Sequence, residues 1–186
     1  ADDVIINGNS VSKTIDVRAL DSAKAVAAKI NAVAGETGVT AQAKTYAKVY
    51  SEYATDQTMS FKINNTTTGD FVMSSSNVSD AIDKINAISG TTGVTASANS
   101  ANQVLLFSNN GSDILVENEK AVTSLRMKTV GFDSVSEVKT LAVHAKKTDN
   151  AILTQSTAHT LKNATTGVNT TFTTTTTDSA AQYDSL

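Results

Sequence analysis

The residues that could act as catalysts or metal ligands are few, and their spacing matches no reactive motif. The only histidines are His144 and His159, and His144 is followed by Ala-Lys-Lys-Thr instead of the Glu and second His of the H-E-x-x-H zinc motif. Cysteine is absent, which removes thiol nucleophiles, disulfides and Cys-ligated zinc. The sequence therefore predicts no catalytic residue, no cofactor and no metal site.

Other reactive patterns are missing as well. The chain has neither the G-x-S-x-G of a nucleophile elbow nor the G-x-G-x-x-G or G-x-x-x-x-G-K of a phosphate-binding loop. Asp113, Glu117 and Glu119 lack the alternating oxygen ligands and fixed glycine of an EF-hand loop, so a solvated strand edge is the simpler interpretation. These absences favour a structural protein over an enzyme.

Composition excludes two classes of partner. The 15 Lys and Arg residues nearly balance the 18 Asp and Glu residues, and no clustered basic face is available for nucleic acid. No apolar run approaches the roughly 20 residues that span a bilayer. The first residues, ADDVIINGN, lack the basic start and apolar stretch of a signal peptide. The chain is thus cytosolic, exported without a cleaved signal, or a piece of a longer protein.

One block of sequence occurs twice, and it determines how the elements are assigned. INAVAGETGVTAQA from Ile30 to Ala43 returns as INAISGTTGVTASA from Ile85 to Ala98 without a gap. A repeated block indicates a repeated structural unit, so the fold can be predicted from two copies.

The first copy predicts a β-hairpin, a helix and a strand. Apolar runs flank Asn7-Gly8-Asn9, and Asn-Gly between such runs is a strong hairpin signal. Asp21 or Ser22 then offers an N-cap for a helix with one apolar stripe. Gly35 is expected to end this helix, and a strand follows over 39–46.

The second copy predicts the same order of elements. They are a strand over 59–63, a turn over 64–69, a strand over 70–74, a helix capped by Ser76 or Asn77 and ended by Gly90, and a strand over 94–98. Strands over 103–107 and 113–116 around Asn109-Asn110-Gly111 predict a further hairpin.

The remaining segments are less regular. Residues 122–130 fit a strand or an irregular connection, whereas 134–147 carry apolar residues at helical spacing and predict a short helix. From Thr157 onward the chain is rich in Thr and fits either a strand or an exposed extended segment. Three tyrosines with helical spacing are expected to pack in a core or between domains and not to form a ligand platform: Tyr46, Tyr50 and Tyr53.

These elements together predict an α+β fold. It consists of two β-hairpin–helix–strand repeats, with small sheets each covered by one helix, and a Thr-rich extended C-terminal segment. The predicted boundaries are 1–56 for the first repeat, 57–130 for the second repeat with its extra hairpin, and 131–186 for the short helix and the tail or connector.

The repeated block resembles the IN motif of bacterial flagellins and of related axial proteins of the flagellum, including the filament cap. The motif residues are Ile30, Asn31, Gly38, Val39 and Ala41 in the first copy and Ile85, Asn86, Gly93, Val94 and Ala96 in the second. INGNSV from Ile6 and VLLFSNNGSDILVEN from Val104 also resemble the central region of flagellins.

This resemblance implies a structural component of the flagellar filament, formed by surface-exposed outer domains that serve motility and filament surface properties. The implied partners are other flagellin subunits in a homopolymeric filament, with host or antibody contacts and neither nucleic acid nor membrane. The implied location is extracellular, on the flagellum, after export without a cleaved signal peptide. Flagellin-type terminal heptad helices are not found near Ala1 or Leu186, so we expect the middle of a flagellin.

Two alternatives stay open. The chain could supply the outer domains of a flagellar cap or hook-associated protein, or it could be a glycan- or host-binding module of a surface adhesin.

The motif residues also have a physical interpretation. Asparagine is a poor helix former whose amide can bond nearby backbone groups, so Asn31 and Asn86 are expected to pair with backbone at the helix-to-strand crossover. Ile30 and Ile85 supply core side chains at the helix end, and the following glycines suit a turn with positive φ. This interpretation predicts a scaffold element and not a binding site.

Overall fold

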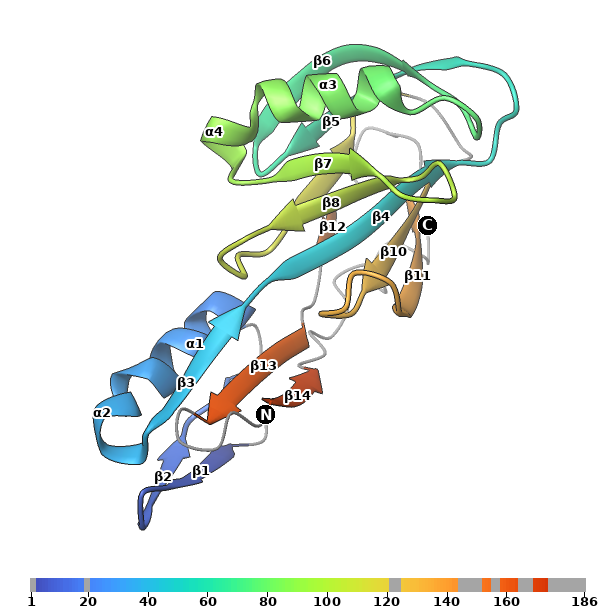
Figure 1. The fold of residues 1–186 in the computed structure, drawn as a ribbon. Helices are drawn as coiled ribbons and strands as arrows, with labels where there is room; N and C mark the ends of the chain where they lie inside the picture. Colours follow the sequence, from blue (N-terminus) through green and yellow to red (C-terminus); the bar gives the residue numbers. More distant parts are fainter. Residues whose placement is uncertain are drawn as a thin grey trace.

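The computed structural model describes residues 3–18, 21–120, 125–143, 152–154, 158–163 and 169–173. This part of the chain is a mixed α and β structure in which neighbouring strands are antiparallel. Its elements gather in two lobes of an elongated molecule (Figure 1). We call them the first lobe, with a core drawn from residues 6–43, and the second lobe, with a core drawn from residues 47–127. Among the described helices, none has the length and apolar character needed to cross a membrane.

The first lobe packs a hairpin and a strand against one amphipathic helix. Its elements are β1 (Val4–Gly8), β2 (Val11–Ile15), α1 (Ala23–Ala32), α2 (Ala34–Thr37), β3 (Val39–Ala43), β13 (Ala158–Asn163) and β14 (Asn169–Thr173). Ser22 caps α1 as predicted, because its side-chain oxygen accepts a hydrogen bond from the Ala25 N–H at 3.2 Å. Helical spacing then brings Val26 and Ile30 to one face, where both are buried.

The predicted first hairpin is present, but its turn lies beyond Asn7-Gly8. Asn9 and Ser10 form the turn with φ of 43° and 64°, and Gly8 is the last residue of β1. A two-residue turn with two positive φ values is of type I′. Gly8 serves a different purpose, because a Cβ there would lie 2.0 Å from the carbonyl oxygen of Thr37 in α2. Close packing of the helix end, and not the turn, requires this glycine.

The strand predicted over 39–46 is in fact two strands that belong to different lobes. β3 ends at Ala43, and β4 (Thr45–Ser51) begins after Lys44. β3 pairs with β13 in the first lobe, whereas β4 pairs with β8 and β10 in the second. The chain crosses between the lobes at this break (Figure 1).

The second lobe contains two sheets. Its further elements are β5 (Gln57–Ile63), β6 (Thr66–Met73), α3 (Ser79–Ala87), α4 (Ser89–Thr92), β7 (Thr95–Ala98), β8 (Val104–Ser108), β9 (Leu115–Asn118), β10 (Leu125–Val130), β11 (Glu137–Val143) and β12 (Ile152–Thr154). One sheet has the order β11-β10-β4-β8-β7, and the other has the order β12-β9-β5-β6. Large side chains from both sheets form a common core, which includes Met59, Phe61, Leu106 and Met127.

The hairpin predicted from residues 103–116 is wrong. β8 and β9 do not pair with each other: β8 pairs with β4 and β7, whereas β9 pairs with β5 and β12. The turn with Gly111 at φ 73° carries the chain from one sheet to the other. Because Val104, Leu106 and Val116 all face the common core, a sheet-to-sheet crossing buries them as well as a hairpin would.

The hairpin of the second copy is tighter than predicted, and its helix begins later. The turn consists of Asn64 and Asn65 alone, with φ of 45° and 68°, and β6 follows at once. α3 begins at Ser79, after Val78, and not directly after a cap at Ser76 or Asn77. Asn77 still contributes, since its side-chain oxygen accepts a long hydrogen bond of 3.4 Å from the Ser79 N–H.

The glycines predicted to end the two helices do not do so. Gly35 and Gly90 lie inside the short helices α2 and α4, which continue each chain beyond α1 and α3. The left-handed residues are Gly38 and Gly93, both with φ of 68°. A hydrogen bond from the N–H of each closes the last turn onto the carbonyl of Ala34 or Ser89, at 2.8 Å in both cases.

The helix predicted over 134–147 is also wrong. β11 pairs with β10 along residues 125–143, so the open edge of β10 draws this segment into a strand. Of the alternatives for 122–130, the strand is correct over 125–130. The predicted Thr-rich extended segment contributes β13 and β14, whereas His144 and residues 174–186 lie outside the described residues.

Replacement of the buried isoleucine near the end of each long helix should destabilise the protein. Ile30 and Ile85 are both 0% exposed, so Ile30→Ala and Ile85→Ala should each lower the free energy of unfolding by about 2–5 kcal/mol. Equilibrium denaturation measures this loss. Val135→Ala is the control, since Val135 is 68% exposed and its replacement should change stability by less than about 0.5 kcal/mol. Losses below about 1 kcal/mol at both core sites would contradict the burial of these side chains.

Candidate functional site

The polar groups of the repeated block meet at two helix-to-strand junctions. At the first, the Asn31 side-chain N–H donates to the Ala41 carbonyl at 3.0 Å, and the Ala41 N–H donates to the Asn31 side-chain oxygen at 2.8 Å. At the second, Asn86 makes the same two hydrogen bonds with Ala96, at 2.9 and 2.8 Å. These are backbone contacts of the kind that the sequence predicts for the two asparagines.

The geometry makes each asparagine a substitute for a neighbouring strand. Its amide offers one donor and one acceptor to one residue, as a hydrogen-bonded residue of an antiparallel strand does. β7 is an edge strand, and Asn86 bonds it on the side away from β8. The side chain therefore covers part of a strand edge that would otherwise be open to pairing with another chain.

The other predicted motif residues surround these hydrogen bonds. The apolar motif residues are all buried: Ile30, Val39 and Ala41 in the first copy, and Ile85, Val94 and Ala96 in the second. The two glycines, Gly38 and Gly93, have the left-handed φ of the turn. The structure brings together the residues of each copy, but it places the two junctions in separate lobes.

Two threonines of the junctions were not predicted. Thr37 Oγ1 donates to the Val33 carbonyl at 3.0 Å and accepts from the Val39 N–H at 3.3 Å. Thr92 makes the equivalent contacts with the Ile88 carbonyl and the Val94 N–H, at 3.1 and 3.2 Å. The signal was available, because Thr precedes Gly in both copies of the block.

The role of Asp80, a further side chain of α3, was also not predicted from the sequence. Asp80 accepts a hydrogen bond of 2.7 Å from the Val72 N–H of β6, which is the edge strand of the other sheet. α3 therefore contacts an edge of each sheet, through Asp80 near its start and Asn86 near its end. An acidic residue in the first turn of a helix favours helix formation by itself, so the sequence alone did not distinguish this role.

The start of α1 carries the clearest electrostatic feature of the first lobe. The Asp21 carboxylate accepts hydrogen bonds from Lys29 Nζ and from the Arg18 N–H, and these lower its pKa below the usual value. The Lys24 N–H donates to the Gly111 carbonyl at 3.0 Å, so a turn of the second lobe caps this helix from outside. The charged pair stabilises the start of the helix, and the backbone hydrogen bond joins the two lobes.

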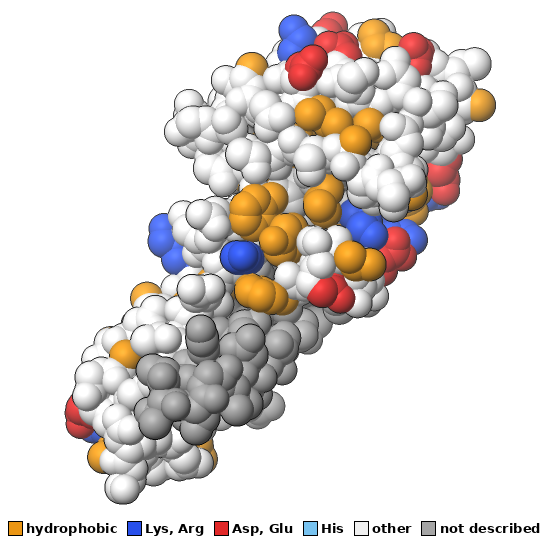
Figure 2. Space-filling view, in the orientation of Figure 1, with side chains coloured by type: hydrophobic (Ala, Val, Ile, Leu, Met, Phe, Trp, Pro, Cys, Tyr) orange, Lys and Arg blue, Asp and Glu red, His pale blue; other side chains and the backbone are white. Residues whose placement is uncertain are grey.

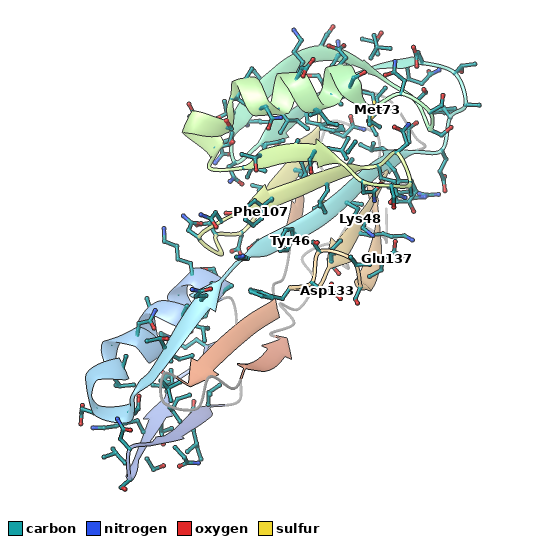
Figure 3. All side chains as sticks on the ribbon, viewed as in Figure 1. Tyr46, Lys48, Met73, Phe107, Asp133 and Glu137 are labelled. Carbon is teal, nitrogen blue, oxygen red and sulfur yellow. The ribbon has the colours of Figure 1, made fainter. Side chains whose placement is uncertain are left out.

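The aromatic residues of β4 lie on the face of the sheet opposite the core. Tyr46 stacks on Phe107 of β8 with ring centroids 4.8 Å apart, and Lys48 and Glu137 lie further along the same sheet (Figure 3). Hydrogen bonding to Lys128 holds the pKa of Glu137 low. Tyr46 and Tyr50 belong to a strand, so the helix suggested by their spacing is wrong. They pack against neighbouring side chains across strands.

The three acidic residues predicted to form a solvated strand edge, Asp113, Glu117 and Glu119, are partly buried instead. Glu117 is 6% exposed and lies 3.8 Å from Lys62 Nζ. Glu119 accepts hydrogen bonds from the hydroxyls of Ser60 and Thr67, at 2.7 and 2.6 Å. Burial raises the pKa of Asp113. Across the described ranges no three His, Cys, Asp or Glu residues are grouped as metal ligands would be.

The polar side chains of the two junctions are already committed to the fold. The amide atoms of Asn31 and Asn86 are engaged by backbone, and the threonine hydroxyls are engaged as well. The arrangement can fix a helix to a strand through these hydrogen bonds.

Comparison with protein families gives two matches to one family model. The model describes the flagellin hook IN motif, and it matches residues 3–48 and 60–110, together more than half of the 186 residues. Each match contains one of the two junctions. Among curated proteins, none matches the chain.

The Asn86→Asp variant tests the paired hydrogen bonds. At neutral pH the carboxylate cannot donate to the Ala96 carbonyl and repels it, so stability should fall by about 1–3 kcal/mol. A protonated carboxyl restores the donor, so the folded state should raise the pKa of the new group above its unfolded value of about 3.9. The loss should therefore be small below that unfolded value and grow as pH rises through the folded pKa.

Denaturation of the variant and the parent between acid and neutral pH measures this difference. Asn109→Asp is the matched control, because Asn109 is exposed in a turn. Its replacement should give a stability difference from the parent that does not change with pH. A stability loss in the Asn86→Asp variant that does not change with pH would contradict the paired geometry.

Glycine replacements test the left-handed turns. Gly93→Ala should cost about 1–2 kcal/mol, since φ of 68° is unfavourable for alanine, and Gly93→Asn should cost less. Gly38→Ala should cost more, because its Cβ would also lie 2.6 Å from Asn9 Nδ2. Gly90→Ala is the control: its site is open and helical, so stability should stay equal or rise. Thermal denaturation ranks the four variants, and equal losses at positions 90 and 93 would refute the assignment.

Proposed function

The chain belongs to the family defined by the flagellin hook IN motif, and on this premise we propose that it forms surface-exposed outer domains of a flagellar filament. Its partners are other flagellin subunits in a homopolymeric filament, and its role is in motility and in the properties of the filament surface. It is exported without a cleaved signal peptide and acts outside the cell, where host molecules or antibodies can contact it.

The observation that carries this proposal is the use of the motif's polar groups. Asn31 and Asn86 engage both amide groups with the backbone of a neighbouring strand. A binding site needs polar groups directed at a ligand. The ten motif residues are therefore assigned a scaffold role, in which they hold helix to strand so that the surface of the domain can vary.

The repeated order of elements supports a duplicated architecture. The proposed units are residues 1–56 and 57–130, each a hairpin, helix and strand, followed by segment 131–186. β4 then crosses from the first unit into the sheet of the second. Matching turns support this division, since Asn9-Ser10 and Asn64-Asn65 have similar φ values.

The surface agrees with a domain that faces solvent in a polymer. Polar and uncharged atoms cover most of the visible face, and hydrophobic side chains gather mainly midway along it (Figure 2). This gathering lies over the sheet that holds Tyr46 and Phe107 (Figures 2 and 3). Polar outer domains keep a filament soluble and limit side-by-side adhesion.

Immunogold electron microscopy of the source bacterium tests the proposal directly. Antibodies raised against this chain should label filaments along their whole length, because every subunit displays its outer domains. Label at the filament tip or at the hook junction alone would indicate a cap or hook-associated protein. Label on the cell body would indicate an adhesin. Either of these patterns would overturn the proposal.

Deletion of the coding sequence provides the control for antibody specificity. A strain that lacks residues 1–186 in frame should lose the label. Filaments that still assemble without this segment would agree with an outer position for the domains it encodes.

A further inference from the structure

The two lobes differ at one strand edge. In the second lobe, β5 has a partner on each side, namely β6 and β9. In the first lobe, β1 occupies the position of β5, because each strand precedes a two-residue turn with positive φ values. β1 pairs with β2, and no strand among the described residues pairs with its other edge.

The second lobe shows what such an edge accepts. β9 runs antiparallel to β5, with Lys62 opposite Glu117 and Phe61 opposite Asn118. Further along the same edge the Glu119 N–H donates to the Ser60 carbonyl at 2.9 Å. By position in the repeat, Ser60 and Lys62 correspond to Ile5 and Asn7 of β1. The occupant that suits the free edge of β1 is therefore an antiparallel strand, and because Asn7 replaces Lys62 this occupant needs no partner for a lysine.

The edge of β1 lacks two of the features that discourage strand addition, namely charged residues and proline. Its sequence, VIING, has no charge and no proline. The edges of β7 and β6, in contrast, are covered by side chains, since Asn86 bonds β7 and Asp80 bonds β6. Ile5 is 61% exposed, whereas Ser60 at the equivalent place is 4% exposed. An uncharged edge with an exposed isoleucine is typical of a strand that meets a partner.

We propose that β1 pairs antiparallel with β1 of a second copy of this chain, with Ile5 opposite Ile5. In a hairpin with a two-residue turn, Gly8 and Ile6 direct their N–H and C=O groups to β2, so those of Ile5 and Asn7 point outward. A twofold axis at Ile5 then places Asp3 opposite Asn7 of the second copy, which brings no like charges together.

A second copy fits this edge because the edge is complementary to itself. The same residues serve both partners, and the two Ile5 side chains cover each other on the exposed face. The contact closes after two copies, so it gives a dimer and not an open fibre. β1 lies at the end of the molecule away from α3, where a second copy can approach it (Figure 1). This inference does not depend on the proposed function and could fail without affecting it.

Sedimentation velocity over a concentration series tests the proposal with the whole chain. We expect a monomer at low concentration and a dimer at high concentration. Ile5→Lys should return the high-concentration sample to monomer, since two lysines would face each other. Val135→Lys is the matched control: Val135 is the other large exposed hydrophobic residue among those described, at 68%, and its replacement should leave the dimer intact.

Two further measurements locate the contact. The chain has no cysteine, so Ile5→Cys introduces a single thiol that should oxidise to a disulfide-linked dimer faster than Val135→Cys. Amide exchange at Ile5 and Asn7 should slow as the protein concentration rises. Circular dichroism checks that each variant stays folded.

Several results would overturn the inference. A monomer at every concentration would exclude the dimer. A dimer that survives Ile5→Lys would place the interface elsewhere. Slow exchange at Ile5 and Asn7 that does not depend on concentration would mean that another segment of the same chain covers β1.

Discussion

The structure depends on joining the end of a helix to the edge of a strand without leaving backbone polar groups unpaired. Asn31 and Asn86 meet this constraint because a primary amide carries the same donor and acceptor pair as the peptide group. Each amide replaces a strand that the fold does not have at that place. The left-handed glycine and the buried threonine that follow then reverse the chain so that the strand reaches the asparagine of its own helix.

In the second lobe, a further asparagine amide pairs with backbone groups in a similar way. Asn64, in the β5–β6 turn, donates to the Thr92 carbonyl at 2.9 Å and accepts from the Leu115 N–H at 2.9 Å, so it joins the end of α4 to β9. Asp80 adds a contact between α3 and β6. Side-chain hydrogen bonds at the edges of the two sheets thus hold α3 and α4 in place. Apolar side chains such as Phe61 and Leu106 form the core that the two sheets share. Edge contacts fix the helices, and apolar packing supplies most of the stability.

The sequence predicts what is local and repeated, and it fails where pairing depends on distant segments. Burial of Ile30 and Ile85 follows from helical spacing, and the asparagine contacts follow from an amide that is a poor helix former and can bond nearby backbone. The supposed hairpin of β8 and β9 failed because turn chemistry does not decide which strands pair. The helix over 134–147 failed because β10 offered an edge, and strand pairing prevailed over an apolar spacing that suited a helix. Asp80 was missed because its partner lies on the edge strand of the other sheet.

The two copies also differ in how they are completed. β7 receives β8 from the residues that directly follow it, whereas β3 receives β13 from residues 158–163, after the whole second lobe. Closing a long loop costs more chain entropy than closing a short one, and contacts between distant residues form late. The second lobe can therefore form from one continuous stretch, whereas the three-stranded sheet of the first lobe needs pairing between segments that lie on either side of it. This dependence follows from β4, which leaves its own repeat to join the sheet of the second lobe.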